Sequence, residues 1–265
     1  MNRLLPVALT LSSTGLFYYF YFYLFTSFPS SHSLYLLCFF HIFLFLSLLS
    51  LIQIICLDPG RVPKDFELSG IPEYDKLYYT ENIVDKYYLL GRVGYCVTCK
   101  RDRPHRAHHC HACKVCTMRY EHHCVFLGTC IGLRNIKLFT LFLMYSALAC
   151  GLVFVHCFFI LAQNEFSWPV LTMEILSGNL LFFFLVFFLV QFSNVCLNIT
   201  GVEYKWEVKS MFDVGVVNNI SQVFGDTFVL WFVPVENCVS SGLKFPMSIK
   251  HKDNFTLESV GQYLI

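Results

Sequence analysis

Charged residues are scarce in this chain of 265 residues: Asp, Glu, Lys and Arg together make up 14% of it. Soluble domains carry about 25% charged residues and seldom reach the aromatic content of 18% found here. The chain also lacks internal repeats and long low-complexity tracts. Its net charge of +1 gives no sign of a nucleic-acid partner, and we expect none. An ordinary soluble domain is therefore excluded, and the hydrophobic content of 56% indicates a membrane protein.

Four apolar runs offer the roughly 20 residues that a helix needs to cross a hydrocarbon core. A cleavable signal peptide is the alternative for the first run, but its apolar region would have only about 7–15 residues and a small-residue cleavage site. We therefore predict an all-α polytopic membrane protein with four transmembrane helices. The four runs are Leu4 to Phe25, Leu34 to Leu57, Ile136 to Ala162 and Val170 to Ile199.

The basic residues set the expected orientation. The connections 27–33 and 163–169 contain no Lys or Arg, whereas 58–137 contains thirteen of the nineteen basic residues. The remaining six lie at Arg3 and in the tail after 200. Because basic residues concentrate in cytoplasmic segments, we expect an integral, multi-pass protein with both termini in the cytosol.

This topology predicts four consecutive parts. The segment between the second and third helices is a cytosolic loop, and its cysteine-rich portion is residues 91–135. In the tail, Phe224 to Val235 is apolar but too short to span, so it should lie at the membrane interface or pack on the helices. The parts are 1–57 with helices one and two and a short lumenal loop, 58–135 with the loop, 136–200 with helices three and four, and 201–265 with the tail.

The stretch from Cys96 to Asn135 holds seven of the thirteen cysteines and six of the ten histidines. In the reducing cytosol such clusters bind metal or act in catalysis and do not form disulfides. Structural zinc sites are tetrahedral, with four Cys or His ligands. Eight donors would make two sites of three cysteines and one histidine, which leaves one cysteine over. The donor pairs begin at Cys96-x2-Cys99 and at Cys110-x2-Cys113-x2-Cys116, and His109, His123 and Cys130 add further donors.

Cys124 is one candidate for the cysteine left over, because it directly follows Glu121, His122 and His123. A thiol is a weak nucleophile at pH 7 unless a base assists it, and a carboxylate-held imidazole is the usual base. The alternative is that Cys124 binds zinc and that Cys130 or Cys116 is the spare. Spacing alone leaves both interpretations open.

From the second apolar run to Val235 the chain resembles the DHHC protein S-acyltransferases, or palmitoyltransferases. Asp58-Pro59-Gly60, Thr200-Gly201-Val202-Glu203 and a C-terminal motif around Asn219 resemble the motifs that flank the cysteine-rich region in this family. The matching positions in that region are Cys96, Cys99, Arg103, Pro104, Arg106, His109, Cys110, Cys113, Cys116, His122, His123, Cys124, Cys130, Gly132 and Asn135.

The resemblance implies an enzyme in which palmitoyl-CoA acylates Cys124 and the acyl group then passes to cysteines of substrate proteins. His122 would be the base and Glu121 would orient it. Endoplasmic reticulum or Golgi membranes are the implied location. Glu203 is expected to pair with a basic residue of the module, and Asn219 to satisfy backbone groups near a helix end. The implied ligands are Cys96, Cys99, His109 and Cys116 for one Zn²⁺ and Cys110, Cys113, His123 and Cys130 for the other.

The chain departs from the family pattern at four positions. Glu121 replaces Asp and carries its carboxylate one methylene further out, and a misplacement of about 1 Å can cost about 10²-fold in rate. These departures keep two alternatives open: a catalytically weak membrane scaffold whose zinc module binds partner proteins, and a membrane sensor that uses Cys124 as a reactive thiol. The other departures are Phe126 for Trp, Thr129 for Asn and Gly201 for the second Thr.

Overall fold

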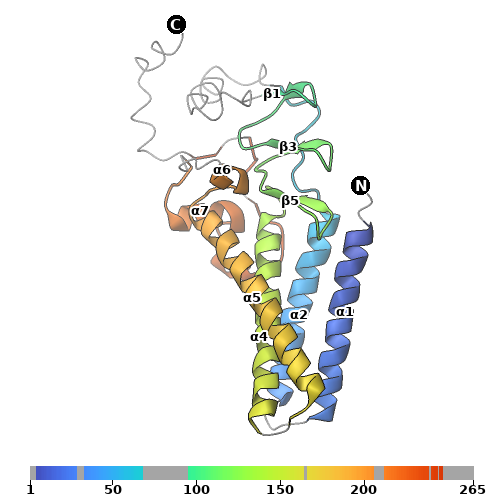
Figure 1. The fold of residues 1–265 in the computed structure, drawn as a ribbon. Helices are drawn as coiled ribbons and strands as arrows, with labels where there is room; N and C mark the ends of the chain where they lie inside the picture. Colours follow the sequence, from blue (N-terminus) through green and yellow to red (C-terminus); the bar gives the residue numbers. More distant parts are fainter. Residues whose placement is uncertain are drawn as a thin grey trace.

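The computed structural model describes residues 4–28, 33–67, 95–163, 166–205, 212–238, 240–243 and 245–246. Residues 68–94 of the expected cytosolic loop and the end of the tail after 246 lie outside these ranges. Four long helices run alongside one another, and a module of short hairpins sits at one end of them (Figure 1).

The long helices are α1 (Leu4–Ser27), α2 (Ser33–Cys56), α4 (Ile136–Ala162) and α5 (Trp168–Cys196). In the described residues three helices are long and apolar enough to cross a membrane, namely Leu34–Cys56, Ile136–Ala162 and Trp168–Cys196. The helix α1 has 24 residues, but its tyrosines and hydroxyl residues lower its hydropathy, and it is not among them. A mostly helical fold with three candidate membrane helices is thus confirmed, while the four-span topology stays a prediction.

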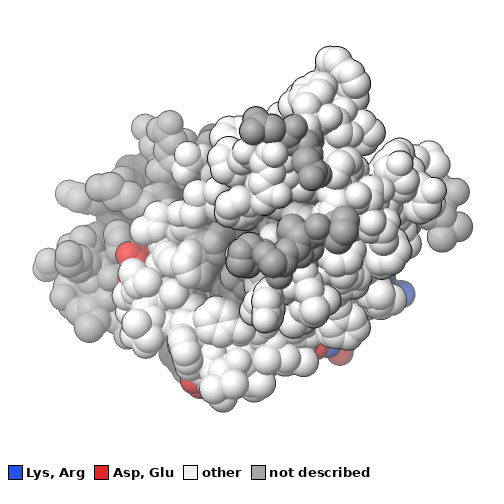
Figure 2. Space-filling view, turned by 90° about the horizontal axis from the view of Figure 1, so that it is seen from below, with Lys and Arg blue, Asp and Glu red and all other residues white. Residues whose placement is uncertain are grey.

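The helix α4 lies at the centre of the bundle, since most of its residues are buried, whereas few residues of α5 are. Tyr21 and Leu24 of α1 are buried in a core cluster with Phe40 of α2 and Val153 of α4, so α1 packs on the bundle. The end of the bundle remote from the hairpins shows few Lys, Arg, Asp or Glu side chains (Figure 2). This apolar end agrees with the absence of basic residues from the connections expected there.

The cysteine-rich module is not α-helical, which corrects the all-α expectation. It consists of three two-stranded antiparallel hairpins, β1–β2, β3–β4 and β5–β6, stacked away from the bundle with β5–β6 nearest to it (Figure 1). In β1–β2 and β3–β4 a pair of cysteines three residues apart closes the tight turn. The strands are β1 (Tyr95–Cys96), β2 (Arg101–Asp102), β3 (His108–Cys110), β4 (Val115–Thr117), β5 (His122–Cys124) and β6 (Thr129–Ile131).

The segment Asp58-Pro59-Gly60 joins α2 to the module. Asp58 Oδ1 accepts the N–H groups of Gly60 and Arg61, which closes a turn. Gly60 has a φ of 96°, a conformation that glycine adopts without steric cost. Its carbonyl accepts the N–H of Met118 at 2.8 Å, so the end of α2 is fixed directly to the hairpins.

The tail returns to the bundle through α6 (Gly201–Lys205), α7 (Val216–Phe224) and the 3₁₀ helix η4 (Phe228–Phe232). Three carbonyls in and after η4, on alternate residues, accept hydrogen bonds from side chains of α2 and α4. The apolar tail segment Phe224 to Val235 therefore packs on the bundle, as one of the two placements expected from the sequence required. The hydrogen bonds run from Lys137 Nζ to Leu230 O, from Tyr145 Oη to Phe232 O and from Gln53 Nε2 to Pro234 O.

Candidate metal centres and active site

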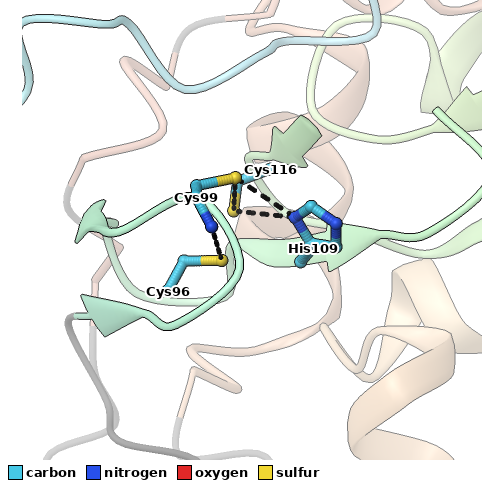
Figure 3. Close-up of side chains that lie close together, drawn as sticks. All are labelled: Cys96, Cys99, His109 and Cys116. Carbon is cyan, nitrogen blue, oxygen red and sulfur yellow. Dashed lines mark hydrogen bonds between the residues drawn. The ribbon is translucent and has the colours of Figure 1, made fainter. Parts of the chain in front are cut away.

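Three thiols and one imidazole converge between the first two hairpins (Figure 3). The ligand atoms of Cys96, Cys99, His109 and Cys116 all lie within 4.8 Å of one another. Cys99 Sγ is 3.8 Å from Cys116 Sγ and 3.2 Å from His109 Nδ1. A tetrahedral zinc with bonds of about 2.3 Å to sulfur and about 2.0 Å to nitrogen separates such atoms by about 3.8 and 3.5 Å. These four residues therefore fit a structural Zn²⁺.

A second set of the same composition joins the second and third hairpins. The ligand atoms of Cys110, Cys113, His123 and Cys130 also lie within 4.8 Å of one another. His123 Nδ1 is 3.4 Å from Cys113 Sγ, and Cys130 Sγ is 3.5 Å from Cys113 Sγ. The structure thus holds two Cys/His clusters that could bind two metal ions. Their members are the two sets of four implied by the resemblance.

The two Cys-x2-Cys pairs form the same turn at the tips of their hairpins. In each pair the N–H of the second cysteine donates to the sulfur of the first, at 3.3 Å from Cys99 to Cys96 and at 3.4 Å from Cys113 to Cys110. The residue after each second cysteine is left-handed, with a φ of 53° at Lys100 and 58° at Lys114. Such turns bring two thiolates to one point, which is what a metal site needs.

The third hairpin repeats this turn with one change. Cys124 ends β5 in the place of the first cysteine, and Gly128 has the left-handed φ of 61°. Leu127 stands where the other two turns have their second cysteine, and a leucine side chain cannot bind a metal. Among the described residues Cys124 belongs to neither cluster, whereas Cys116 and Cys130 each belong to one. In this arrangement Cys124 is the cysteine left over.

Strand alternation separates the two histidines beside Cys124. Side chains of successive strand residues point to opposite faces, so His122 and Cys124 share one face of β5 and His123 takes the other. His123 is accordingly in the second cluster. The His122 ring lies 5.3 Å from the Phe139 ring of α4, and Cys124 is buried in a core cluster with residues of α2, α4 and α5. A thiol and an imidazole therefore share the face that meets the bundle.

Burial favours the neutral forms of the His122 imidazole and the Cys124 thiol. It lowers the pKa of His122 to about 4, with a further contribution from His123, so the imidazole is neutral at pH 7 and can accept a proton. Burial raises the pKa of the Cys124 thiol, which the backbone N–H groups of Leu127 and Phe126 oppose. The thiol thus needs a base to ionise at pH 7, and the backbone N–H groups of Phe126 and Leu127 can stabilise the thiolate once it forms.

Glu121 does not contact His122 in the way that an orienting carboxylate would. Its Oε2 accepts the N–H of Gly201 at 2.7 Å, and its buried Oε1 has no hydrogen-bond partner. Burial raises the pKa of Glu121 to about 7, against the opposing effects of the Arg119 charge and the Gly201 N–H. The structure therefore brings together Cys124 and His122, but it turns the Glu121 carboxylate toward α6.

Comparison with known proteins agrees with this site. The profile of the DHHC palmitoyltransferase family matches residues 91–207. "Probable protein S-acyltransferase 12" of Arabidopsis thaliana is 31% identical over 222 residues, which is 75% of this chain and 75% of that protein. "Palmitoyltransferase ZDHHC15" of Xenopus laevis is 30% identical over 176 residues, which is 59% of this chain and 51% of that protein.

This chain belongs to the DHHC palmitoyltransferase family. As a member of this family it is an acyltransferase, and the resemblance of its motifs to the family pattern is confirmed. The chain spans about half the length of the Xenopus relative and three quarters of the Arabidopsis one.

Two of the four departures from the DHHC pattern lie on the hairpin that carries Cys124. Phe126 is 64% exposed at the hairpin tip, next to the first helix: Thr10 Oγ1 of α1 donates to its carbonyl at 3.1 Å. Thr129 is buried and pairs with Cys124 across β5–β6. The Phe126 side chain is therefore exposed beside α1, while Thr129 is buried opposite Cys124 in the hairpin.

The expected partner of Glu203 in the DHHC module is Arg106. Its guanidinium donates to both carboxylate oxygens of Glu203, at 2.8 and 2.9 Å, and both side chains are buried. The rings of Phe212 and Phe245 lie 4.4 and 4.9 Å from the guanidinium carbon. This pair fixes the tail to the module, and the expectation for Glu203 is confirmed.

Sequence reasoning missed Asn198, whose buried side chain links two buried arginines of the module to the end of α5. Its Oδ1 accepts from Arg106 at 3.0 Å and from Arg119 at 3.2 Å, and its Nδ2 donates to Phe212 O. Burial lowers the pKa of Arg119 to about 10. The place of Asn198 two residues before Thr200 gives no sign of this role in the sequence.

Asn219 behaves as the family resemblance implied. Its Nδ2 donates to the carbonyl of Cys196, the last residue of α5, at 2.7 Å. Its Oδ1 accepts the N–H of Val214 at 3.0 Å. A helix end has carbonyls without intrahelical partners, so Asn219 closes α5 where the tail turns back toward the active site.

Proposed function

We propose that this protein is a protein-cysteine S-palmitoyltransferase that acylates Cys124 from palmitoyl-CoA and passes the acyl group to cysteines of substrate proteins. The observation that carries the proposal is the position of Cys124. It stands outside both metal clusters, with His122 on the same face of β5, where the module meets helices long enough to cross a membrane.

The reaction has two steps. His122 takes the Cys124 proton, the thiolate attacks the thioester carbonyl, the carbon–sulfur bond to CoA breaks, and CoA leaves as its thiol with that proton. A substrate thiol then attacks the acyl-Cys124 thioester, which restores the Cys124 thiol. This is a ping-pong route with a covalent intermediate.

Two structural Zn²⁺ ions would be held by the two clusters, where they stabilise the folded hairpins and take no part in the transfer. The eight ligands are those named above, and Cys124 remains free for chemistry. Because His123 and Cys130 flank the β5–β6 hairpin on its cluster side, metal binding would hold the strand that carries His122 and Cys124.

The proposed membrane arrangement has four spans with both termini in the cytosol, in the endoplasmic reticulum or Golgi. It is supported by the packing of α1 against α2 and α4 and by the start of α1 beside the module (Figure 1). Each buried CH₂ of a palmitoyl chain contributes about 0.8 kcal/mol. A nucleophile at the end of the bundle suits a donor whose acyl chain lies in the membrane and whose CoA lies in water.

The test is covalent labelling of the purified chain with an alkyne-tagged palmitoyl-CoA. The wild type should carry a hydroxylamine-sensitive adduct, and the Cys124→Ser variant should not. Cys56→Ser removes an exposed cysteine outside both clusters and should label normally. An unlabelled wild type with intact zinc would favour the second function, a scaffold whose module binds partner proteins, which the departures at Glu121 and Gly201 keep open.

A further inference from the structure

The two remaining departures from the family pattern, Glu121 and Gly201, touch each other. They are 80 residues apart in the chain, and the Glu121 Oε2 accepts the Gly201 N–H at 2.7 Å. Glu121 is only 3% exposed, so this hydrogen bond is shielded from water.

The contact leaves no room for a side chain at position 201. A Cβ added there would lie 2.9 Å from the Glu121 carbonyl oxygen and 3.7 Å from Glu121 Oε2. Cβ atoms do not approach other heavy atoms that closely, and the neighbouring atom is backbone, which cannot rotate away. Any residue other than glycine therefore pushes the start of α6 away from the segment before β5.

Glu121 is also part of the hairpin scaffold. Its own N–H donates to Ile131 O of β6 at 3.0 Å, directly before β5 begins. The carboxylate contact thus joins the base of the β5–β6 hairpin to the turn that follows α5. Within the described residues no hydrogen bond joins Glu121 to His122, and strand alternation turns the two side chains apart.

We propose that Glu121 and Gly201 are a matched pair of positioning residues. The absence of a side chain at Gly201 lets its backbone approach Glu121, and the longer carboxylate of Glu121 then accepts the Gly201 N–H. The pair holds the strand that carries His122 and Cys124 against the end of the bundle. It acts through those two residues and touches no reacting atom. The functional part of the inference rests on the proposed acyl transfer by Cys124.

The test is a double-mutant cycle toward the family's residues: Glu121→Asp, Gly201→Thr and both together, in the full-length protein. Each single variant should slow Cys124 labelling at saturating palmitoyl-CoA by about tenfold or more, because the shorter carboxylate misses the amide and the threonine forces the backbones apart. The double variant should be about as slow as Gly201→Thr alone, because the threonine has already forced the two backbones apart and the shorter carboxylate then removes a contact that is no longer made.

Three readouts separate positioning from simple damage. Zinc content and the KM for palmitoyl-CoA should stay at wild-type values in all three variants while the maximal rate changes. Glu121→Gln keeps an oxygen for the Gly201 N–H and should lose much less rate than Glu121→Ala. Gly15→Ala is the control, since a Cβ added at Gly15 meets nothing within 4 Å.

Two results would overturn the pairing: a Glu121→Asp variant at least as fast as wild type, or a double variant whose loss equals the product of the single losses. A wild type that takes no label would instead overturn the acyl-transfer function. The pairing is then judged from the thermal unfolding of the same four proteins, in which a double variant about as stable as Gly201→Thr supports it and additive losses refute it.

Discussion

Hairpins β1–β2 and β3–β4 each end in two cysteines three residues apart, whereas hairpin β5–β6 ends in Cys124 and Leu127. In all three the residue after the turn is left-handed, and backbone amides approach the first sulfur. The backbone is therefore shared, and the ligand set differs. Leucine in place of the second cysteine keeps the turn but leaves a single thiol, that of Cys124, which belongs to neither metal cluster.

This comparison shows how one local structure serves two purposes. In the first two hairpins the N–H groups around sulfur would support thiolates in the two proposed zinc sites. In the third, the same arrangement surrounds a thiol that faces the bundle. The amides that help to hold a zinc ligand in one turn can thus help to stabilise a nucleophile in the next.

Removing a metal ligand should have the largest effect. In Cys113→Ser we expect one zinc to be lost and the hairpins to open, because binding of structural zinc contributes about 10–16 kcal/mol to folding. Metal analysis per chain and limited proteolysis measure this. Retention of both ions by Cys113→Ser would contradict the assignment, and Cys56→Ser serves as the control with an unaffected cysteine.

The two neighbouring histidines should separate catalysis from metal binding. In His122→Gln the two ions should remain while labelling slows by about 10² to 10⁴-fold, the range for loss of a general base. In His123→Gln one ion should be lost. The measurement is zinc content and labelling rate on the same preparations. A metal loss in His122→Gln that matches the loss in His123→Gln would mean that strand alternation does not divide their roles.

The tail contacts the third hairpin through the Glu121–Gly201 hydrogen bond, whereas it contacts the segment before the second through the charged pair Arg106–Glu203, and this pair should make stability depend on pH. Burial raises the pKa of Glu203, but the charge and hydrogen bonds of Arg106 outweigh it, so the pKa lies below its ordinary value. A depressed pKa stabilises the fold above the unfolded value of about 4.3, and this stabilisation is lost as pH falls through the folded pKa.

Glu203→Gln should accordingly lower stability at pH 7 by about 3–5 kcal/mol, because it leaves Arg106 buried without its charged partner. The difference from wild type should begin to shrink below about pH 4.3, where the unfolded carboxyl takes up a proton, and should be smallest below the lower folded pKa, where the folded wild-type carboxyl is protonated as well. Thermal unfolding across pH measures it. A difference that stays constant from pH 7 to pH 3 would show that the pair has no linkage to protonation.

The smallest effect is expected at Leu127. Leu127→Ala should cost about 2 kcal/mol, the low end for such a truncation, because a hairpin tip can close around the gap. Leu127→Met should cost less than about 1.5 kcal/mol. Both variants should keep two zinc ions, and thermal unfolding with metal analysis checks this. A zinc loss in Leu127→Ala would mean that this turn takes part in a metal site.

Much of the architecture was predictable because its signals are local. Helix-length apolar runs predicted α2, α4 and α5 to within a few residues, and Cys-x2-Cys spacing predicted two metal clusters. The hairpins themselves were not expected, since strands of two or three residues leave no readable alternation. The fold class was thus correct for the helices and incomplete for the module.

The contacts of the site that could not be predicted from the sequence join segments that are far apart in the chain. Glu121 was expected on His122, its neighbour, but its carboxylate contacts Gly201, 80 residues away. The link from Asn198 to Arg106 and Arg119 likewise requires the tail to fold back over the module. No spacing rule reports such pairs, because they exist only after the helices have packed.

The central claim is that Cys124 is the one cysteine of the module left free of metal and that it carries the acyl group. The most direct measurement is zinc content and thioester labelling together on purified wild type and Cys124→Ser. The account predicts two zinc ions per chain in both proteins, with the hydroxylamine-sensitive label only in wild type. Loss of one zinc ion from Cys124→Ser would contradict it.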